Sequence, residues 1–581
     1  MQSSAANRST NNNNNTHMKR LSFLFFVTLG AGMLVVSCKQ GDKSNIMAPK
    51  DAAMVMHLNN TSLSSKLSWQ EIKATNWFKE AYSKAPDSLL RKLLDDPDNS
   101  GMDTKADMVF YMHKIGRGSY FAFTGLLKDA AAFEAFNKKV SEGAAVSKDG
   151  EASLMSLKDE AVVSWKAGRF VYMVSIPDLG GLGSLLYRKG SYSEPYRLSV
   201  DSLKTIAKNS FEIKGDNSIG NDKRFAELIK EPGDMHFWVN NEYYLSALGF
   251  GGDMLGMMKA GDLLKGNVSA TTLNFENGKI TMKSKSYLND QLASLYKKFP
   301  PKKISADVIN RIPSENVVGV IAMNYSPEGL KELIKLTGLD GLSNDFLYKA
   351  GYSIDEFVKA NKGEMLISFS DLEIKKKEMT IPGIDGSEPY KYTTTQPDVK
   401  VLFATSVNDK AAFDKLIAVL SKEVPKEGAG IPEISYQINK DWFVAGNSND
   451  FVNKFVSGNG SKQPFVDKLT GSNFGMFVDL QKVIKSLQNP EMGEREKQSA
   501  EASLKVWQDI LITSGGFSDG SVSSYGEVNM VDKSVNSLKQ LNQYIDAMAG
   551  INKRNRGNTG LQDAPVLSDT AATVAPPSIE K

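Results

Sequence analysis

The sequence predicts an α+β fold made of two tandem homologous units, each a mainly antiparallel sheet with helices packed on one face. Three observations predict it: an internal repeat, strand-like runs joined by tight turns, and helical runs between some strands. With 581 residues the chain exceeds the length over which one hydrophobic core keeps growing, so more than one folded unit is expected. Its 41% apolar and 24% charged residues are typical of a globular protein.

The repeat consists of five pairs of segments that occur in the same order in both halves of the chain. DAAAFEAF, which begins at Asp129, matches DKAAFDKL, which begins at Asp409. The other pairs begin at Pro49 and Pro313, Arg169 and Trp442, Asp234 and Asn473, and Phe275 and Phe517. A single match of this length occurs by chance, whereas several matches in one order indicate duplication.

Strands are predicted from apolar runs bounded by turn residues. Asn277-Gly278 and Asp519-Gly520 each separate two alternating runs, the pattern of a two-residue hairpin turn with positive φ. Further strand-like runs span 107–114, 119–126, 153–157, 161–165 and 170–175. Because hairpins join most of the strands, we expect an antiparallel sheet.

Helices are predicted at 130–140, 410–420 and 537–548, where apolar residues recur with helical spacing. Pro300-Pro301 cannot continue a helix and separates the predicted units. The second unit carries an insertion, Glu373 to Pro397, which we expect to extend a hairpin or to form an exposed flap. The predicted boundaries are 46–302 and 308–549 for the units and 553–581 for a disordered tail.

The N-terminal residues predict export. Lys19 and Arg20 precede an uncharged run that ends at Ser37, the arrangement of an export signal. The only cysteine in the chain, Cys38, follows this run directly and has no partner for an internal disulfide. A plain transmembrane anchor is the alternative, although the run is short for a bilayer span.

Val35-Val36-Ser37-Cys38 resembles a bacterial lipobox. The resemblance implies that Cys38 is acylated and that the chain is cut just before it, which would anchor the protein to a membrane. The predicted boundaries are an upstream extension from a wrong start at 1–17, a signal peptide at 18–37 and a lipidated tether at 38–45.

Three short motifs are similar to those of a family of Bacteroidota cell-envelope lipoproteins known as a domain of unknown function. They are Pro49-Lys50-Asp51-Ala52-Ala53, Asp96-Pro97 followed by Ser100-Gly101-Met102-Asp103, and Leu127-Lys128-Asp129. The resemblance implies attachment to the outer membrane, at its periplasmic face or at the cell surface, and it supplies no catalytic residues. Surface export in that phylum is associated with acidic residues after the cysteine, whereas this chain continues Lys39-Gln40-Gly41-Asp42-Lys43.

Several chemistries lack their sequence patterns. Removing the three charged residues before Cys38 takes the formal charge of +3 to zero, and without a basic block we expect no nucleic-acid partner. No Walker or dinucleotide-binding pattern predicts a nucleotide or other cofactor, and no Gly-x-Ser-x-Gly predicts a serine hydrolase. We therefore predict no catalytic residues and no cofactor.

Metal sites are also weakly indicated. His57, His113 and His236 lie in separate strand-like runs without ligand spacing, so we expect surface or half-buried strand side chains rather than metal ligands. The segment from Asp95 to Asp107 has the composition of a calcium loop but matches the EF-hand pattern only in part. We interpret it as a solvated loop and predict no metal.

Two features point to surface chemistry. The Met- and Gly-rich stretch from Leu248 to Met258 is either helix core or a partner surface, with flexible side chains suited to varied apolar partners. Its candidate surface residues are Phe250, Met254, Leu255, Met257 and Met258. Thr570, in the predicted tail, stands in a three-residue motif that resembles an O-glycosylation acceptor of the same phylum.

The leading functional hypothesis is a non-catalytic envelope lipoprotein that offers a binding or scaffold surface to an envelope protein or glycan. One alternative is a hydrolase acting on glycan or peptide through carboxylates between the two units. Another is a carrier of lipid or another hydrophobe, which would require a continuous apolar cavity.

Overall fold

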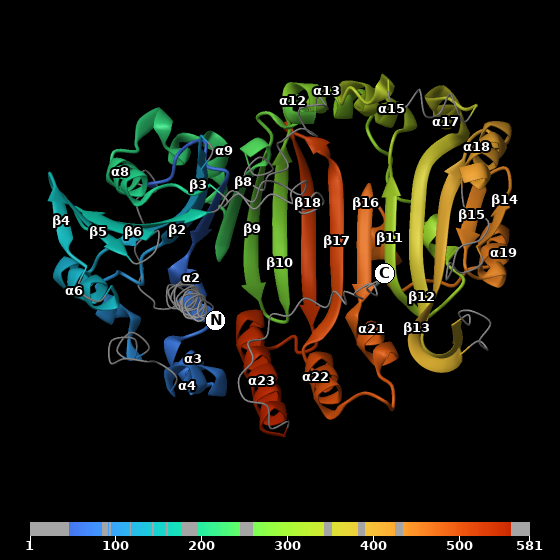
Figure 1. Ribbon diagram of the computed structural model, residues 1–581. Coiled ribbons are helices and arrows are strands. Elements are labelled where there is room, and N and C mark those ends of the chain that lie inside the picture. The colour runs from blue at the N-terminus through green and yellow to red at the C-terminus, as the bar shows by residue number, and fades with distance from the viewer. Residues whose placement is uncertain are drawn as a thin grey trace, which may run out of the picture.

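The computed structural model describes residues 46–83, 91, 95–116, 118–141, 144–157, 161–176, 196–243, 260–341, 351–381, 390–423 and 434–558. These residues form the predicted α+β fold, in which eighteen strands make one antiparallel sheet (Figure 1). In this part of the chain no helix combines the length and apolarity that a bilayer crossing requires.

Ten strands come from the predicted first unit, here called the first half. They are β1 (Met54–Leu58), β2 (Met108–Ile115), β3 (Gly118–Leu126), β4 (Val146–Asp149), β5 (Ala152–Leu157), β6 (Ala161–Lys166), β7 (Arg169–Ile176), β8 (Met235–Asn240), β9 (Val268–Glu276) and β10 (Lys279–Tyr287). Across the sheet their order is β4-β5-β6-β7-β3-β2-β1-β8-β9-β10.

Eight strands come from the second half. They are β11 (Val317–Asn324), β12 (Asn361–Ile381), β13 (Tyr390–Val407), β14 (Ser435–Ile438), β15 (Trp442–Gly446), β16 (Phe474–Asp479), β17 (Trp507–Ser518) and β18 (Ser521–Met530). Their order is β14-β15-β13-β12-β11-β16-β17-β18. This order repeats, strand for strand, the order β6-β7-β3-β2-β1-β8-β9-β10 of the first half.

The two halves meet edge to edge. β10 pairs with β18 over nine residue pairs, from Lys279 opposite Asn529 to Tyr287 opposite Ser521. One backbone hydrogen bond recurs in both halves, from Asn59 N to Asp234 O at 3.0 Å and from Asn324 N to Asn473 O at 2.8 Å. The sheet is therefore continuous across the junction, and the repeated unit is a stretch of this sheet.

The predicted turns, strands and helices are present. Glu276 pairs with Lys279, and Ser518 pairs with Ser521, across two-residue turns in which Gly278, Asp519 and Gly520 have positive φ. The insertion lengthens a hairpin, because β12 and β13 remain paired to Ile381 and Tyr390. The helix predicted at 537–548 continues to Asn558, so residues 553–558, which we assigned to a tail, belong to the helix; the rest of that predicted tail lies outside the described residues.

Helices flank the sheet along its length. They are α2 (Asn60–Lys66), α3 (Trp69–Ala74), α4 (Asn76–Ser83), α6 (Ala130–Val140), α8 (Val200–Ser210), α9 (Lys223–Leu228), α12 (Ala260–Leu264), α13 (Asp290–Lys298), α14 (Ala306–Asn310), α15 (Pro327–Leu336), α17 (Ile354–Ala360), α18 (Lys410–Glu423), α19 (Asn449–Ser457), α20 (Val466–Leu469), α21 (Leu480–Leu487), α22 (Glu494–Leu504) and α23 (Ser537–Asn558).

The helices pack on both faces of the sheet, so the expectation of one covered face is wrong. On the face that we call outer, Val162 and Tyr111 share a buried cluster with Leu203 of α8. On the other face, called inner, their strand neighbours Val163 and Phe110 share a cluster with Phe133 of α6. Because successive side chains of a strand point to opposite faces, these two clusters lie on opposite sides.

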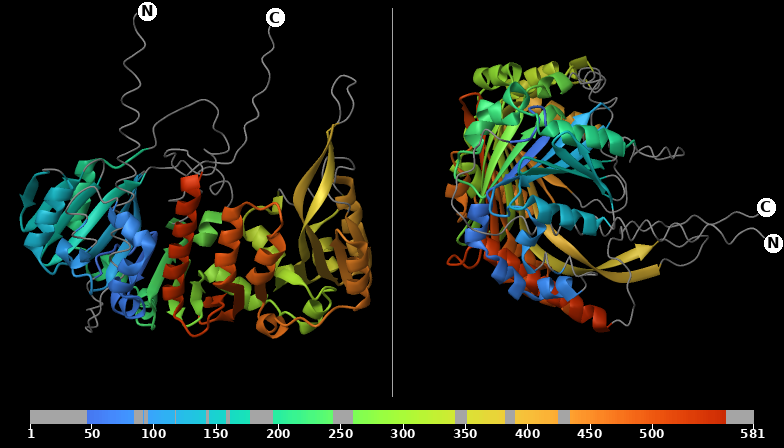
Figure 2. Two further views of the ribbon diagram at one scale, coloured as in Figure 1. Left: turned by 90° about the horizontal axis from the view of Figure 1, so that it is seen from below. Right: turned by 90° about the vertical axis from the view of Figure 1, so that its left-hand side faces the viewer.

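In the second half the outer face carries the main core. Val320, Ala322, Leu366, Leu402 and Val444 are at most 1% exposed and pack with α14, α19 and α20. The inner face holds a smaller buried cluster near the sheet edge, in which Phe413 of α18 packs with Ala360 and Val407. Figure 2 shows that the sheet is curved, with helices along its two long rims.

Candidate functional site

A row of apolar side chains crosses the inner face of the second half. The strand register places Phe403 beside Ile367, Ile367 beside Ile321, Ile321 beside Met476, and Met476 beside Ile512. All five side chains are half-buried. We call these residues the apolar row, and no polar side chain interrupts it over five adjacent strands.

The apolar row continues past the junction of the halves. Ile512 is opposite Gly526, Gly526 is opposite Met282, and Met282 is opposite Leu273. Met282 is 37% exposed. A parallel row contains Phe369, Val478, Ile510, Val528 and Ile280.

The same strands are apolar on their outer face, which explains how such a surface can form. Leu366 and Val320, next to row residues in sequence, are buried at 0% and 1% exposure under helices of the outer face. Strands that are apolar on both sides normally lie between two layers of structure. Here the described residues supply the second layer only along the rims and near the sheet edge.

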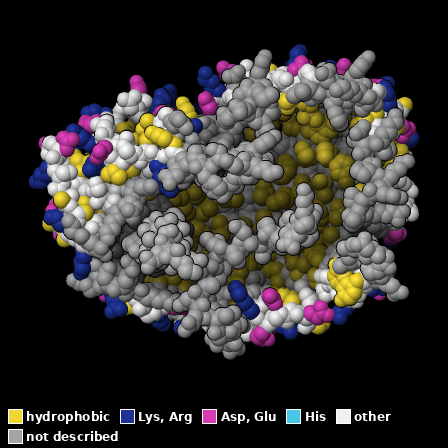
Figure 3. All heavy atoms as spheres, viewed as in Figure 1, with side chains coloured by type: hydrophobic (Ala, Val, Ile, Leu, Met, Phe, Trp, Pro, Cys, Tyr) yellow, Lys and Arg dark blue, Asp and Glu magenta, His cyan; other side chains and the backbone are white. Residues whose placement is uncertain are grey.

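Two amphipathic helices border the apolar row with apolar side chains that are not buried. α21 places Leu480, Val483, Ile484 and Leu487 at helical spacing, and none of its residues is buried. It packs against β11, β12 and β17. α15 lies along the opposite rim (Figure 1). Figure 3 shows a hollow with apolar side chains at its floor on this face.

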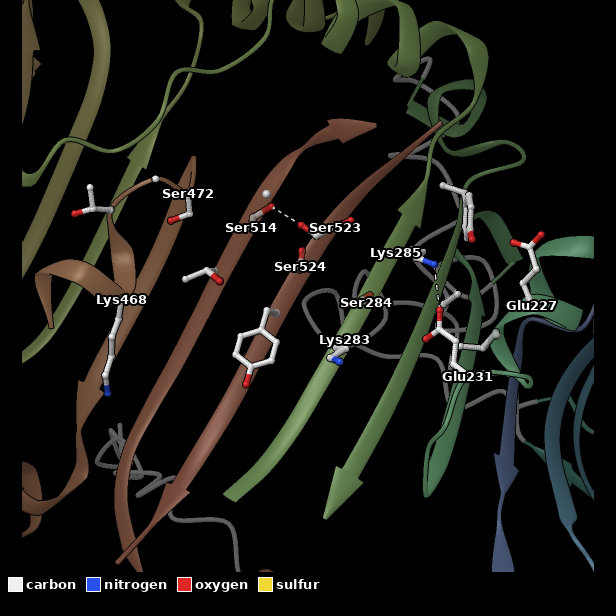
Figure 4. Close-up of a pocket in the computed structure, with 18 residues that line it drawn as sticks. Glu227, Glu231, Lys283, Ser284, Lys285, Lys468, Ser472, Ser514, Ser523 and Ser524 are labelled. Carbon is white, nitrogen blue, oxygen red and sulfur yellow. Dashed lines mark hydrogen bonds and ion pairs between the residues drawn. The ribbon is translucent and has the colours of Figure 1, made fainter. Parts of the chain in front are cut away.

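The outer face has a polar cavity at the junction, which we call the seam pocket (Figure 4). It has a volume of about 560 Å³ and lies between α9 and α20. Its charged lining side chains are Glu227, Glu231, Lys283, Lys285 and Lys468, and Ser, Thr and Tyr hydroxyls make up much of the remainder. At the junction, the charged side chains therefore gather on the outer face.

Glu231 is a carboxyl group of the seam pocket with a hydrogen-bond partner for each of its oxygens. Its two oxygens accept hydrogen bonds from Lys285 Nζ at 3.1 Å and from Thr272 Oγ1 at 2.9 Å. Burial acts to raise its pKa, but these bonds hold the pKa below its ordinary value. A carboxyl that stays ionised cannot donate a proton as a general acid at neutral pH, so the arrangement does not favour the carboxylate hydrolase.

His57 and His236 form a buried pair that sequence reasoning missed. They face each other on β1 and β8, their Nδ1 atoms are 3.1 Å apart, and they are 8% and 2% exposed. The expectation of surface or half-buried histidines is thus wrong for both. Their contact joins residues 179 positions apart, and no local pattern marks it. His113, the third histidine, contacts Tyr120 and Asp51.

The outer ring nitrogen of each histidine contacts an oxygen atom. His57 Nε2 lies 3.2 Å from Asp107 Oδ2, and His236 Nε2 lies 3.0 Å from the Glu231 carbonyl. Both Nε2 atoms thus face oxygen acceptors, while the two Nδ1 atoms face each other. Burial, and then the charge of His57, lower the pKa of His236.

The acidic loop from Asp95 to Asp107 uses its carboxylates within the fold. Asp96 caps the following turn, and Asp98 accepts hydrogen bonds from Thr104 Oγ1 at 2.5 Å and Lys128 Nζ at 2.7 Å. Asp107 faces His57. Among the described residues, no three His, Cys, Asp or Glu side chains are grouped so that they could hold a metal ion.

The remaining predicted site residues lie outside the described residues. They are the lipobox residues Val35, Val36 and Ser37 with Cys38, the candidate partner surface of Phe250, Met254, Leu255, Met257 and Met258, and Thr570. Their predicted roles stay predictions. The apolar row was not among the predicted sites, although the uninterrupted apolar run of β11 is a signal that both faces of that strand are apolar.

Comparisons with known proteins identify no family. No family model matches the chain, and no curated protein matches it. Solved structures of TP0453 match weakly. Crystal form III is 12% identical over 46% of this chain and 90% of that chain, with a TM-score of 0.24, and crystal form IV is 11% identical with a TM-score of 0.23. Likeness this slight carries no information about function.

Proposed function

We propose that the protein is a non-catalytic binding protein that holds the acyl chains of a lipid against the apolar row. The observation that carries the proposal is the row itself, five half-buried apolar side chains on adjacent strands at the floor of a hollow. A contiguous apolar surface that the fold leaves only half-buried is a candidate binding site. This proposal corresponds to the hydrophobe-carrier alternative of the sequence analysis.

An acyl chain fits the row better than a peptide does. A peptide brings backbone N–H and C=O groups that need partners, and the apolar row offers none. An acyl chain has no such groups, and each methylene that leaves water for an apolar contact contributes roughly 0.8 kcal/mol. Met476 and the neighbouring Ile and Phe side chains can adapt to a flexible chain.

The predicted address agrees with a lipid ligand. Acylation at Cys38, which the lipobox resemblance implies, would hold the protein at an envelope membrane. A protein confined there meets lipids at high local concentration. A scaffold for an envelope protein or glycan is the second candidate, and the polar seam pocket is the observation that favours it.

Binding of a fluorescent fatty acid tests the proposal. We expect dansyl-labelled undecanoic acid to bind the wild-type chain with enhanced, blue-shifted emission. The double variant Ile367→Asp/Ile512→Asp places two carboxylates in the row and should bind at least about tenfold more weakly. Both side chains are half-buried, so the fold should persist.

A matched variant controls for the added charge. Ile115 is 41% exposed at the end of β2, remote from the row, and Ile115→Asp should leave the affinity unchanged. Absence of probe binding by the wild-type chain, or equal binding by the double variant, would overturn the proposal.

A further inference from the structure

The seam pocket is built from both halves of the chain. β9, β10 and α9 of the first half form one side, and β17, β18, α20 and the loop after α20 form the other. The strand register places Lys283 opposite Tyr525 and Tyr525 opposite Thr513, so one row of outer-face side chains crosses the junction. Figure 4 shows Glu227 and Lys468 on opposite sides of Lys283. The pocket therefore exists only because the two halves pair.

The charges of the seam pocket are largely balanced. Of its three lysines, one pairs with Glu231 at 3.1 Å, and Lys468 Nζ lies 3.9 Å from Asp509 Oδ1. Lys283 and Glu227 are exposed, and neither side chain forms a hydrogen bond or an ion pair with a described residue. These two side chains have opposite charges, so the pocket has no clear excess of charge that would select an ion.

Hydroxyl groups line the floor of the pocket. The hydroxyls of Thr513 and Ser523 donate no hydrogen bond to a described residue. The Tyr525 hydroxyl donates to Glu527 Oε2 at 2.8 Å, which holds its ring between Lys283 and Thr513. A cavity of about 560 Å³ lies within the size range of small-molecule sites. Polar groups without partners among the described residues thus converge on a space large enough for a ligand.

We propose that the seam pocket binds a saccharide. A sugar hydroxyl both donates and accepts hydrogen bonds. It can therefore accept from the Lys283 ammonium, which only donates, and donate to the Glu227 carboxylate, which only accepts. The Thr513 hydroxyl can take either role. The charged and hydroxyl lining disfavours an acyl chain. Because the pocket and the apolar row lie on opposite faces of the sheet, this inference does not rest on the proposed lipid binding.

Two other classes of ligand fit the pocket less well. Anions are commonly held at the N-terminus of a helix, whereas α9 and α20 contribute Leu228 and Lys468 from their C-terminal ends. A helix C-terminus carries partial negative charge, which disfavours an anion. A peptide that binds a sheet by strand addition needs a free edge strand, whereas the floor strands β10, β17 and β18 are already paired with one another.

An array of immobilised oligosaccharides from bacterial lipopolysaccharide, capsule and peptidoglycan tests the proposal with the full chain. The saccharide that binds most strongly is then titrated by calorimetry. We expect Lys283→Met/Thr513→Val, with one substitution in each half, to bind it at least about tenfold more weakly, because hydrogen bonds from both sides of the junction are lost. Lys223→Met/Thr393→Val makes the same chemical changes at exposed positions outside the pocket and should leave the affinity unchanged.

The inference is supported if the pocket variant alone loses saccharide affinity, while it binds dansyl-undecanoic acid and unfolds in urea like the wild-type chain. Between about 0.05 M and 0.5 M sodium chloride, the saccharide affinity should change less than about twofold. A steep loss with salt would assign the pocket to an anion and overturn the inference. Absence of binding to every arrayed saccharide, equal binding by the pocket variant, or binding of arrayed peptides in place of saccharides would also overturn it. Intact dansyl-undecanoic acid binding would then leave the proposed function standing.

Discussion

Among the described residues, helices cover the inner face of the sheet in the first half but leave the apolar row of the second half only half-buried, although eight strands follow the same order in both. In the first half, Phe133 of α6 is fully buried in a cluster that includes Phe110, Phe123 and Phe170. Its counterpart in the repeat, Phe413 of α18, shares its cluster with two other buried residues. The same strand arrangement therefore supports a core in one half and an accessible apolar surface in the other.

The difference comes from what surrounds the strands. In the first half, Leu63 of α2 and Met102 are buried in the same cluster as Phe133 of α6. In the second half, the amphipathic α21 lies over the rim and leaves the row half-buried. The same strand order is thus compatible with a buried inner face in one half and a half-buried apolar row in the other.

The largest expected effect distinguishes the two equivalent phenylalanines. Phe133→Ala should lower the free energy of unfolding by about 4 kcal/mol, because it leaves a cavity among aromatic neighbours. Phe413→Ala should cost less, about 3 kcal/mol, because its cluster is smaller and nearer the sheet edge. Urea unfolding measures both. Equal losses would show that the two inner faces are packed alike and would contradict the comparison.

A smaller loss of stability is expected from a substitution just before β8, at a position where the counterpart before β16 has a neutral residue. Asp234 is fully buried and accepts hydrogen bonds from Lys66 Nζ, Ser62 Oγ and Phe275 N, each at 2.6 Å. The counterpart in the second half is the neutral Asn473. Asp234→Asn should destabilise the protein by about 2 kcal/mol, because it weakens bonds to a charged acceptor.

A double-mutant cycle in urea isolates that ion pair. The free energy of unfolding is measured for Lys66→Met, for Asp234→Asn and for the double variant. We expect the double variant to lose less stability than the sum of the two single losses, because both substitutions break the same ion pair. If the two losses simply add, Asp234 acts without Lys66, and the ion pair does not hold α2 to the sheet.

The smallest effect is a pH dependence confined to the first half. The folded protein holds the pKa of His236 below its ordinary value of 6.5, so the unfolded chain binds protons more readily in this range. Stability should therefore fall as the pH drops through 6.5, by less than about 1.4 kcal/mol per pH unit. Asp107 and Glu231 are the nearby acidic residues, and both act to raise that pKa.

The second half provides the control for this titration. Ala322 and Gly475 are opposite each other on β11 and β16, where the first half has the two histidines. The variant His57→Ala/His236→Gly copies that pair. Between pH 7 and pH 5.5 it should lose the part of the slope that His236 contributes. An unchanged slope would assign the pH dependence to other groups.

Local patterns predicted most of the fold. Asn277-Gly278 and Asp519-Gly520 located two hairpins, and the helical spacing at 130–140 located α6, because these signals depend on neighbouring residues alone. The continuous sheet was not predicted, because pairing of β10 with β18 depends on contacts between distant residues. Helices on both faces were missed for the same reason.

The candidate site was harder to predict than the fold. An apolar strand such as β11 signals two apolar faces, but whether a helix covers each face depends on the path of segments elsewhere in the chain. The His57–His236 contact is equally non-local. The predicted partner surface within 250–258 and the lipidation site lie outside the described residues, so the structure neither supports nor opposes them.

Photo-crosslinking with a lipid tests the central claim most directly. A phosphatidylcholine that carries a diazirine in its acyl chain is mixed with the full chain and irradiated, and the labelled peptides are identified by mass spectrometry. The account predicts label on β11, β12, β16 and β17, around Ile321, Ile367, Met476 and Ile512, and the loss of that label in Ile367→Asp/Ile512→Asp. Label confined to other peptides, or equal labelling of the two chains, would contradict it.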